Sequence, residues 1–222
     1  MCGRFTLTQP ELLAEHFGVH IDPVPPPRYN IAPSQPVGVI LKRGDHPPEY
    51  RLQQWGLIPA WARDAAIGNR LINARVETAH EKPSFRDAFK RRRCLIPVDG
   101  FYEWKKAKQG KQGKQPYYFQ LPQHQLFALG GLWETWQDIE TFTILTTAAS
   151  ADIQSIHHRM PVILAPENYA QWLDPNQTDN AHLLQLIHAH APATIQRYAV
   201  STKVSNARVD QPDCIVAING LL

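Results

Sequence analysis

The chain has 222 residues but only three cysteines, Cys2, Cys94 and Cys214, which are far apart in the sequence. Their number and spacing exclude a disulfide framework and a CxxC metal or redox motif, and such sparse cysteine is typical of the reducing cytosol. No apolar run approaches the roughly 20 residues of a membrane span, and no signal-peptide pattern follows the first residue. We therefore expect a cytoplasmic protein with no metal site and no membrane association.

The motifs of several common enzyme classes are missing as well. There is no GxGxxG, no P-loop and no GxSxG, so dinucleotide-binding folds, P-loop enzymes and serine hydrolases have no motif support. We expect no cofactor. A large excess of one charge is also absent, because 23 Lys and Arg residues stand against 20 Asp and Glu residues. The net charge of +3 favours anionic partners only weakly and does not by itself identify a nucleic-acid-binding protein.

The composition is that of one globular domain. Hydrophobic residues make up 43% of the chain and charged residues 19%, which are ordinary values, and no repeat or linker divides residues 1–222. Apolar patterns predict strands at residues 3–7, 37–43, 51–59, 101–106, 115–121, 127–136, 141–149, 198–204 and 214–218, and helices after residue 8 and at 83–92, 166–173 and 178–189. Clustered strands with helices between the clusters predict an α+β fold with a mainly antiparallel, barrel-like β core and flanking helices.

Local patterns give finer predictions. Thr8 and Glu11 have the spacing of a capping box, and Ser84 is the expected cap of the helix at 83–92. The proline-rich residues 23–36 predict an ordered surface loop, and residues 107–114, rich in lysine and glycine, predict a hairpin loop. Cys94 and Cys214 lie among apolar residues and are expected to be buried structural thiols.

Polar residues embedded in apolar stretches are the candidates for chemistry. In LINARVET, residues 73, 75 and 77 alternate, so their side chains share one face if the segment is extended. In GFYEW, Glu103 stands between Tyr102 and Trp104, and in IHHRMPVIL, His157 precedes a buried strand. Each residue also has an interpretation without a catalytic role. Glu103 can be a solvent-facing carboxylate on an edge strand, and His157 can be a histidine whose hydrogen bonds are all satisfied at the start of a strand.

Aromatic and basic residues are also interleaved between residues 55 and 93. Trp55, Trp61, Arg63, Arg70 and Arg75 are followed by the run KRRR at 90–93. Tryptophans there can serve the core, and the basic run can stabilise a helix C-terminus. Flat aromatic rings beside arginines are also how single-stranded nucleic acid is held, by stacking and by phosphate pairing.

Cys2 stands directly behind the initiator methionine. Once Met1 is removed, Cys2 carries a free α-amine and a thiol on adjacent carbons. The α-amine has an ordinary pKa of about 7.7–8.0, so an appreciable fraction is neutral at physiological pH. The position thus offers two nucleophiles at one residue.

Six motifs occur in one order through the whole chain, namely MCGRF, RYNIAPSQ, WGLIPAWA, LINARVET, GFYEW and IHHRMPVIL. In these motifs the chain resembles the SOS response-associated peptidase family, whose fold unit is the SRAP domain. The resemblance implies a DNA damage response protein that senses abasic sites in single-stranded DNA. It also implies a covalent crosslink, in which Cys2 and the ring-opened aldehyde of the abasic sugar form a stable thiazolidine.

The resemblance further implies roles for individual residues. The catalytic set is Cys2, Asn73, Glu103 and His157: Glu103 would move protons at the amine, His157 would act as acid and base at the sugar, and Asn73 would hold the cysteine or the sugar. The DNA-binding set is Arg4, Trp61, Arg75 and Arg159. The chain departs from some relatives at Ala62, where they carry a second tryptophan, and in the tail SNARVDQPD around Asn206.

Two alternatives stay open. One is a thiol peptidase or amidohydrolase with Cys2 as nucleophile and His157 as base, and the other is a nucleic-acid-binding module with an inert Cys2. Under the favoured interpretation the protein is a lyase-type crosslinking enzyme. We expect it to be a monomer, associated with the nucleoid, whose partner is single-stranded DNA containing abasic sites.

Overall fold

The structure is a computed structural model that describes residues 2–106, 113–188 and 195–218. Within these residues the strands are β1 (Phe5–Leu7), β2 (Arg28–Ile31), β3 (Pro36–Leu41), β4 (Glu49–Trp55), β5 (Asn73–Arg75), β6 (Arg93–Val98), β7 (Gly100–Lys106), β8 (Lys114–Gln120), β9 (Phe127–Trp136), β10 (Ile139–Ala148), β11 (Arg159–Pro161), β12 (Ile163–Leu164) and β13 (Gln196–Ala199). The α-helices are α1 (Leu13–Phe17), α2 (Val76–Ala79), α3 (Arg86–Arg91), α4 (Ala151–Gln154), α5 (Tyr169–Leu173) and α6 (Asn180–His188). Most of the α-helices are short, and the strands provide the framework.

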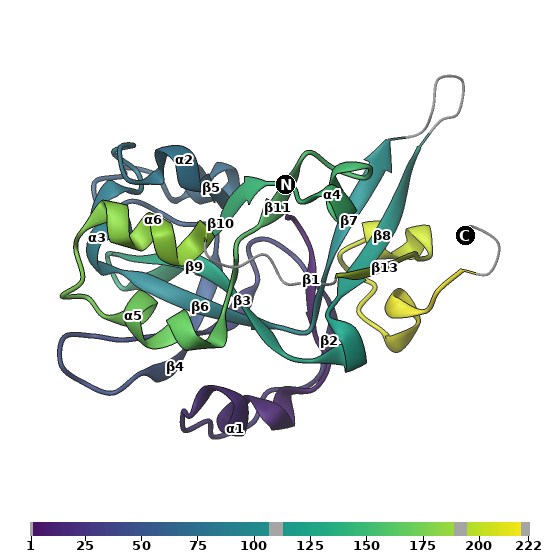
Figure 1. Ribbon diagram of the computed structural model, residues 1–222, viewed down its shortest axis with the longest axis horizontal. Helices are drawn as coiled ribbons and strands as arrows, with labels where there is room; N and C mark the ends of the chain where they lie inside the picture. The colour runs from purple at the N-terminus through teal and green to yellow at the C-terminus, as the bar shows by residue number, and fades with distance from the viewer. Residues whose placement is uncertain (1, 107–112, 189–194, 219–222) are drawn as a thin grey trace.

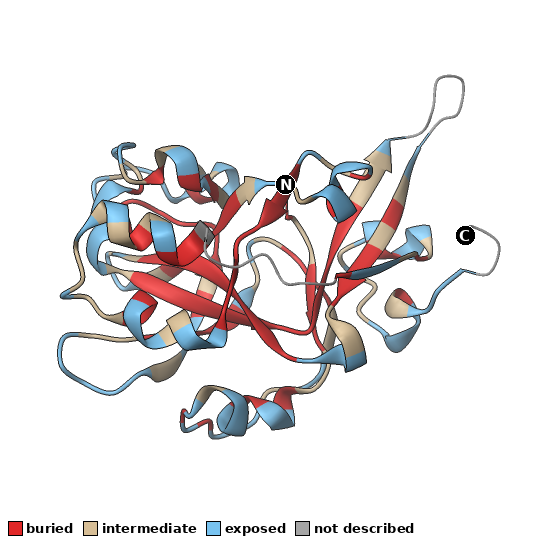
Figure 2. Ribbon diagram, viewed as in Figure 1, coloured by how far each residue is buried: buried red, intermediate tan, exposed pale blue. Residues whose placement is uncertain are grey.

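Five strands close into a barrel. In the larger sheet β10 pairs with β4, β4 with β3, β3 with β6 and β6 with β9, and β9 returns to β10. Every pair in this ring is antiparallel except β10 with β4. The barrel interior holds the main hydrophobic core, which appears as the continuous buried region of Figure 2.

The second sheet has five strands in the order β13-β8-β7-β1-β2. It leaves the barrel on the side where the long β7–β8 hairpin projects (Figure 1). A smaller cluster of buried residues, including Tyr102, Tyr118, Val204 and Cys214, packs the C-terminal segment against this sheet. The helices α3, α5 and α6 lie on the opposite side of the molecule, around the barrel (Figure 1).

The predicted α+β class with a mainly antiparallel, barrel-like core is confirmed, and so are the main strands of the barrel and the hairpin. Cys94 and Cys214 are buried free thiols, as predicted. Arg93, the last residue of KRRR, is buried and donates to backbone carbonyls at the ends of two helices, Phe89 of α3 and Trp172 of α5. Of the basic run, Arg93 therefore binds the C-terminal ends of these two helices, whereas Arg92 pairs with Glu134 of β9. Part of the predicted loop at 107–114 lies outside the described residues.

Some local predictions are wrong because tertiary contacts override the local pattern. Thr8 makes no capping hydrogen bond to a helix; its backbone and hydroxyl both donate to Asp99 instead. Ser84 does not cap α3, which begins at Arg86 after Phe85. Residues 28–31 of the predicted loop form β2, which pairs with β1. In the tail, regular pairing with β8 ends at Ala199.

The rest of the tail turns into short 3-10 segments, η5 (Thr202–Ser205) and η6 (Pro212–Ile215). The predicted strand at 214–218 is therefore reduced to a single bridge between Val200 and Ala217.

Candidate functional site

Cys2 lies at the junction of the two sheets. It precedes β1, whose residue Phe5 pairs with Phe101 of β7, and the backbone N–H of Tyr102 donates to the carbonyl of Arg4 (3.0 Å). This antiparallel register carries the residues before β1 alongside Tyr102 and Glu103. The Cys2 side chain is fully buried, and its thiol faces the carbonyl of Arg4 (Sγ to O 3.9 Å).

A buried aspartate, which sequence reasoning missed, holds β1 in this register. Asp99 lies between β6 and β7 and accepts hydrogen bonds from the hydroxyls of Thr6 and Thr8 and from the backbone N–H groups of Thr8 and Gln9. A carboxylate with this many donors is well stabilised despite its burial. Asp99 thus pins the N-terminal strand to the start of the strand that carries Glu103. No local pattern in VDGFYEW indicates these contacts, because their partners are at least 90 residues away in the chain.

Asn73 and Glu103 reach Cys2 from opposite sheets. Asn73 begins β5, which runs parallel to β10, and its Nδ2 donates to the Cys2 carbonyl (2.9 Å). Glu103 is in the middle of the second sheet, where β7 is flanked by β1 and β8, and only 3% of it is exposed. The interpretation of Glu103 as a solvent-facing residue of an edge strand is therefore wrong.

His157 completes the cluster from the turn between α4 and β11. Its Nδ1 accepts a hydrogen bond from the backbone N–H of Arg159 (3.0 Å) and lies 3.9 Å from Oε1 of Glu103. The carbonyl of Arg159 lies at the same distance from Nδ1 (3.0 Å), so the ring is held by both backbone polar groups of that residue. The ring also stacks on His158, with 4.5 Å between centroids. The four predicted catalytic residues are thus brought together, from segments far apart in the chain.

The thiol of Cys2 is not activated as a free thiolate. Burial, and secondly the negative charge of Glu103, raise the pKa of Cys2 well above its ordinary value. The thiol therefore stays protonated until a base takes its proton, and Glu103 is the side chain whose charge acts on it.

The predicted DNA-binding arginines differ in exposure. Arg75 is exposed at the end of β5, whereas Arg4 is partly buried and donates to the carbonyl of Gly3 (2.9 Å). Arg159 is 9% exposed and forms a bidentate ion pair with Glu77 (2.6 and 2.9 Å), and it also donates to the carbonyl of Thr146. The extended face predicted for LINARVET ends at Arg75, because α2 begins at Val76 and includes Glu77.

The ion pair gives a prediction for stability against pH. The hydrogen bond from Arg159 lowers the pKa of Glu77 below its ordinary 4.5. A lowered folded-state pKa stabilises the protein above pH 4.5, and this contribution is lost as the pH falls through the folded value. We expect Glu77→Gln to lower the free energy of unfolding by about 1 kcal/mol at pH 7, because the carboxylate is nearly half exposed.

Urea unfolding at pH 7 and at pH 3 tests this. The difference between wild type and Glu77→Gln should shrink towards zero at the lower pH, while Glu81→Gln, at a carboxylate with 69% of its side chain exposed, should change little at either pH. A Glu77→Gln deficit that is the same at both pH values would contradict the assignment.

The motif RYN docks the C-terminal segment beside the site. Asp210 accepts hydrogen bonds from Arg28 and from the backbone N–H of Tyr29 and Asn30, and Asn30 in turn donates to the carbonyl of Asn206 (3.1 Å). These hydrogen bonds place Ser205 between Arg4 and Trp104, which follow Cys2 and Glu103 in the sequence.

Ser205 contacts both of its neighbours. Its carbonyl accepts from Arg4 (3.5 Å), and its hydroxyl accepts from the indole N–H of Trp104 (3.0 Å). The tail around Asn206 therefore supports the site through the backbone carbonyls of Ser205 and Asn206 and through the hydroxyl of Ser205.

The two tryptophans of the interleaved stretch have separate roles. Trp55 is buried in the barrel and donates to the carbonyl of Ile72. Trp61 is 59% exposed and lines a hollow of about 360 Å³ together with Arg63 and Arg70. An exposed indole beside two arginines is a suitable surface for an unstacked base and its phosphate.

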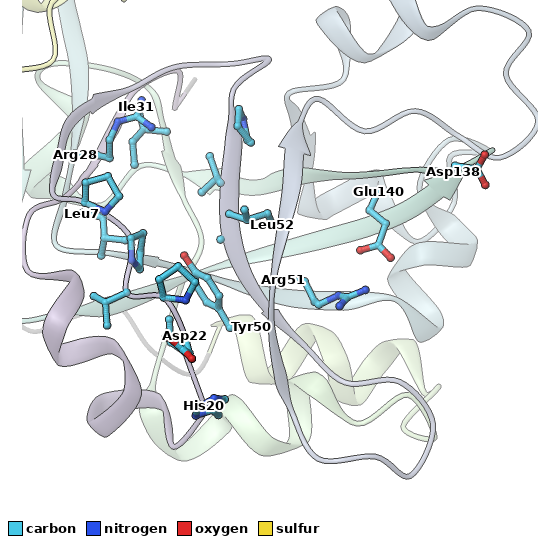
Figure 3. A pocket seen from close by; sticks show the side chains of 18 residues that line it. Leu7, His20, Asp22, Arg28, Ile31, Tyr50, Arg51, Leu52, Asp138 and Glu140 are labelled. Carbon is cyan, nitrogen blue, oxygen red and sulfur yellow. The ribbon is translucent and has the colours of Figure 1, made fainter.

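Another hollow lies away from the candidate catalytic residues. A groove of about 900 Å³ runs between the proline-rich segment and the outer face of the β3–β4 hairpin (Figure 3). Its walls include Asp22, Tyr50 and Leu52. Among the described residues, no group of three His, Cys, Asp or Glu side chains has the arrangement of a metal site, and no helix there is long and apolar enough to span a membrane.

The chain resembles known proteins along most of its length. The family model described as SOS response associated peptidase (SRAP) matches residues 1–207. Abasic site processing protein YoqW of Bacillus subtilis is 41% identical over 226 residues, covering 97% of this chain and 99% of that protein. Abasic site processing protein HMCES of Pongo abelii is 30% identical, covering 87% of this chain and 66% of the relative.

Solved structures share the fold. A crystal structure of a Bacteroides thetaiotaomicron protein superposes with a TM-score of 0.84 at 25% identity, covering 98% of this chain and 100% of the other. A phage-related protein of Bordetella bronchiseptica superposes with a TM-score of 0.74 at 29% identity, covering 90% of this chain and 94% of the other. With a family model that spans nearly the whole chain and relatives of this identity, the protein belongs to the SOS response associated peptidase (SRAP) family.

Proposed function

We propose that this protein processes abasic sites in single-stranded DNA by forming a thiazolidine crosslink through Cys2. The observation that carries the proposal is the set of groups around Cys2, where Asn73 holds its carbonyl and Glu103 and His157 lie 3.9 Å apart. The names of the relatives, abasic site processing proteins, support the same substrate.

The chemistry balances with the groups present. After removal of Met1, the neutral α-amine of Cys2 attacks the aldehyde carbon of the ring-opened sugar to give a carbinolamine. Loss of water gives an iminium ion, and Sγ then adds to the same carbon while the thiol proton passes to a base. The net reaction is aldehyde plus aminothiol giving thiazolidine plus water, with no oxidant or metal required.

Each neighbouring residue has a task in this sequence. Buried Glu103 takes the proton that the amine and then the thiol must lose, and returns it when the ring opens. His157 assists opening of the sugar ring as a general acid. Asn73 holds the Cys2 backbone so that amine and thiol face one carbon. Exposed Arg75 and Trp61 serve the flanking phosphates and bases; Arg159 could join them only by leaving Glu77.

A peptidase role is less well supported. Thiol peptidases depend on a thiolate with a lowered pKa, whereas burial and Glu103 raise the pKa of Cys2. In crosslinking the amine reacts first, so a protonated thiol is no obstacle. Hydrolysis of a peptide library by wild type, lost in Cys2→Ala, would favour the peptidase alternative.

Intact mass spectrometry tests the proposed function. We expect the mature protein to lack Met1, since only then does Cys2 bear the α-amine. After exposure to single-stranded DNA carrying an abasic site, the mass should rise by that of the oligonucleotide minus one water, and the adduct should survive denaturation. Fully active protein that retains Met1, or a stable adduct formed faster on continuous duplex than on single strands, would refute the mechanism.

A further inference from the structure

A further hollow adjoins the candidate catalytic residues. It has a volume of about 520 Å³ and is lined on one side by the outer part of the β7–β8 hairpin and on the other by the turn between α4 and β11. Figure 1 shows these two segments facing each other. The lining residues are Glu103, Trp104, Lys105, Lys106, Lys114, Gln154, Ser155, Ile156, His157 and His158. We call this hollow the hairpin pocket.

The hairpin pocket is cationic at its rim. Lys106 and Lys114 are directly opposite each other across β7 and β8, both are exposed, and like charges in that arrangement are unfavourable. In the part of the chain that the structure describes, neither lysine forms an ion pair. Lys105 adds a third ammonium group, and Glu103 is the one carboxylate of the lining. An anionic ligand between the two opposed lysines would relieve their repulsion.

The positive surface continues past Trp104. Trp104 and Lys114 also line a shallower hollow with Arg4 and Ser205. The indole is half-buried and fixed by its hydrogen bond to Ser205. A path with cations on both sides of a fixed aromatic ring therefore begins at Glu103 and His157 and leads away from them along the hairpin.

We propose that the hairpin pocket binds the sugar–phosphate backbone on one side of the abasic nucleotide, with Lys106 and Lys114 each neutralising a phosphate. The inference rests on the proposed function, because it makes the pocket the first stretch of strand beyond the reacting sugar. The opposed lysines and the contact with Glu103 and His157 favour a polyanion that extends from the catalytic cluster.

The salt dependence of binding tests the phosphate contacts. The logarithm of the binding constant falls as the logarithm of the salt concentration rises, and each phosphate contact on a single strand contributes about 0.7 to the steepness of that fall. We would measure the binding of an undamaged single-stranded oligonucleotide by fluorescence anisotropy. The double variant Lys106→Ala/Lys114→Ala should make the slope shallower by about 1.4 and lower the affinity at 0.1 M salt by about 10- to 30-fold. The matched control, Lys42→Ala/Lys90→Ala, removes two lysines from the β3–β4 connection and α3, on the other side of the molecule (Figure 1), and should leave the slope unchanged. Equal slopes for both double variants would overturn the proposal.

Oligonucleotides with nucleotides on only one side of the abasic site test which side of the strand the hairpin pocket binds. Two oligonucleotides carry the abasic site at one end, one with only 5′ flanking nucleotides and the other with only 3′ flanking nucleotides. Crosslinking to one of them should slow in Lys106→Ala/Lys114→Ala by about tenfold at low protein concentration, and crosslinking to the other should not change. Equal slowing with both would show a diffuse charge effect and no subsite. If wild type forms no adduct but the slope difference persists, the proposed function fails and the phosphate site stands.

Discussion

Cys2→Ser is expected to abolish the denaturation-resistant adduct. Serine keeps the α-amine and nearly the same volume, so the variant should still form an imine with the abasic aldehyde. It lacks the thiol that closes the ring, so the imine should hydrolyse on heating. The measurement is a denaturing gel of protein and abasic single-stranded DNA, with and without borohydride. We expect an adduct with Cys2→Ser only after reduction, and with wild type in both lanes.

Another buried free thiol provides the control. Cys214→Ala removes a cysteine that is 1% exposed in the small core cluster of the second sheet, and it should crosslink like wild type. A heat-stable adduct with Cys2→Ser in the absence of borohydride would show that another nucleophile forms the bond.

Glu103→Gln is expected to slow both formation and reversal of the adduct, by about 10²- to 10⁴-fold, the usual contribution of a general acid or base. Glutamine keeps the shape of the side chain at this buried position in β7, opposite Tyr117 of β8, but it cannot take a proton. Because the same proton transfers run backwards when the thiazolidine opens, both directions should suffer. The measurements are the crosslinking rate against pH and the transfer of a preformed adduct to competing abasic DNA.

The variant His157→Ala distinguishes the role of His157 from that of Glu103. It should slow formation chiefly at the stage of sugar ring opening, so a small free aldehyde, which needs no ring opening, should react with this variant almost as fast as with wild type. Glu103→Gln should be slow with both substrates. Superimposable pH profiles for wild type and Glu103→Gln, with unchanged reversal, would make Glu103 a bystander.

Much of the candidate site could be predicted because its residues stand out against their surroundings. A carboxylate inside FYEW and a histidine before MPVIL interrupt runs that otherwise form buried strands, and the two side chains do lie together, 3.9 Å apart, in the candidate site. The supporting residues were not predictable in the same way. Asp99 pins β1 through Thr6 and Thr8, more than 90 residues away, and no local pattern records such a contact.

The solvent exposure of the arginines could not be predicted from the sequence either. Arg75 and Arg159 are both basic residues next to catalytic positions, yet one is exposed and the other is 9% exposed beside Glu77. The difference depends on where β5 ends and α2 begins, since the helix directs Glu77 to Arg159. Alternation in LINARVET predicts one continuous face, and the helical turn after Arg75 breaks it.

The sequence by itself predicted the reactive group, because a cysteine that follows an initiator methionine would carry an adjacent amine and thiol once that methionine is removed. It also determined the fold class, since apolar runs of strand length must be buried in sheets. Only the tertiary structure decided that five strands close into a barrel and that Asn73, Glu103 and His157 converge on Cys2. It decided too that Lys106 and Lys114 oppose each other beside that cluster. The physical reason is that strand pairing and burial depend on neighbours distant in the chain, whereas covalent position and hydrophobic periodicity are local.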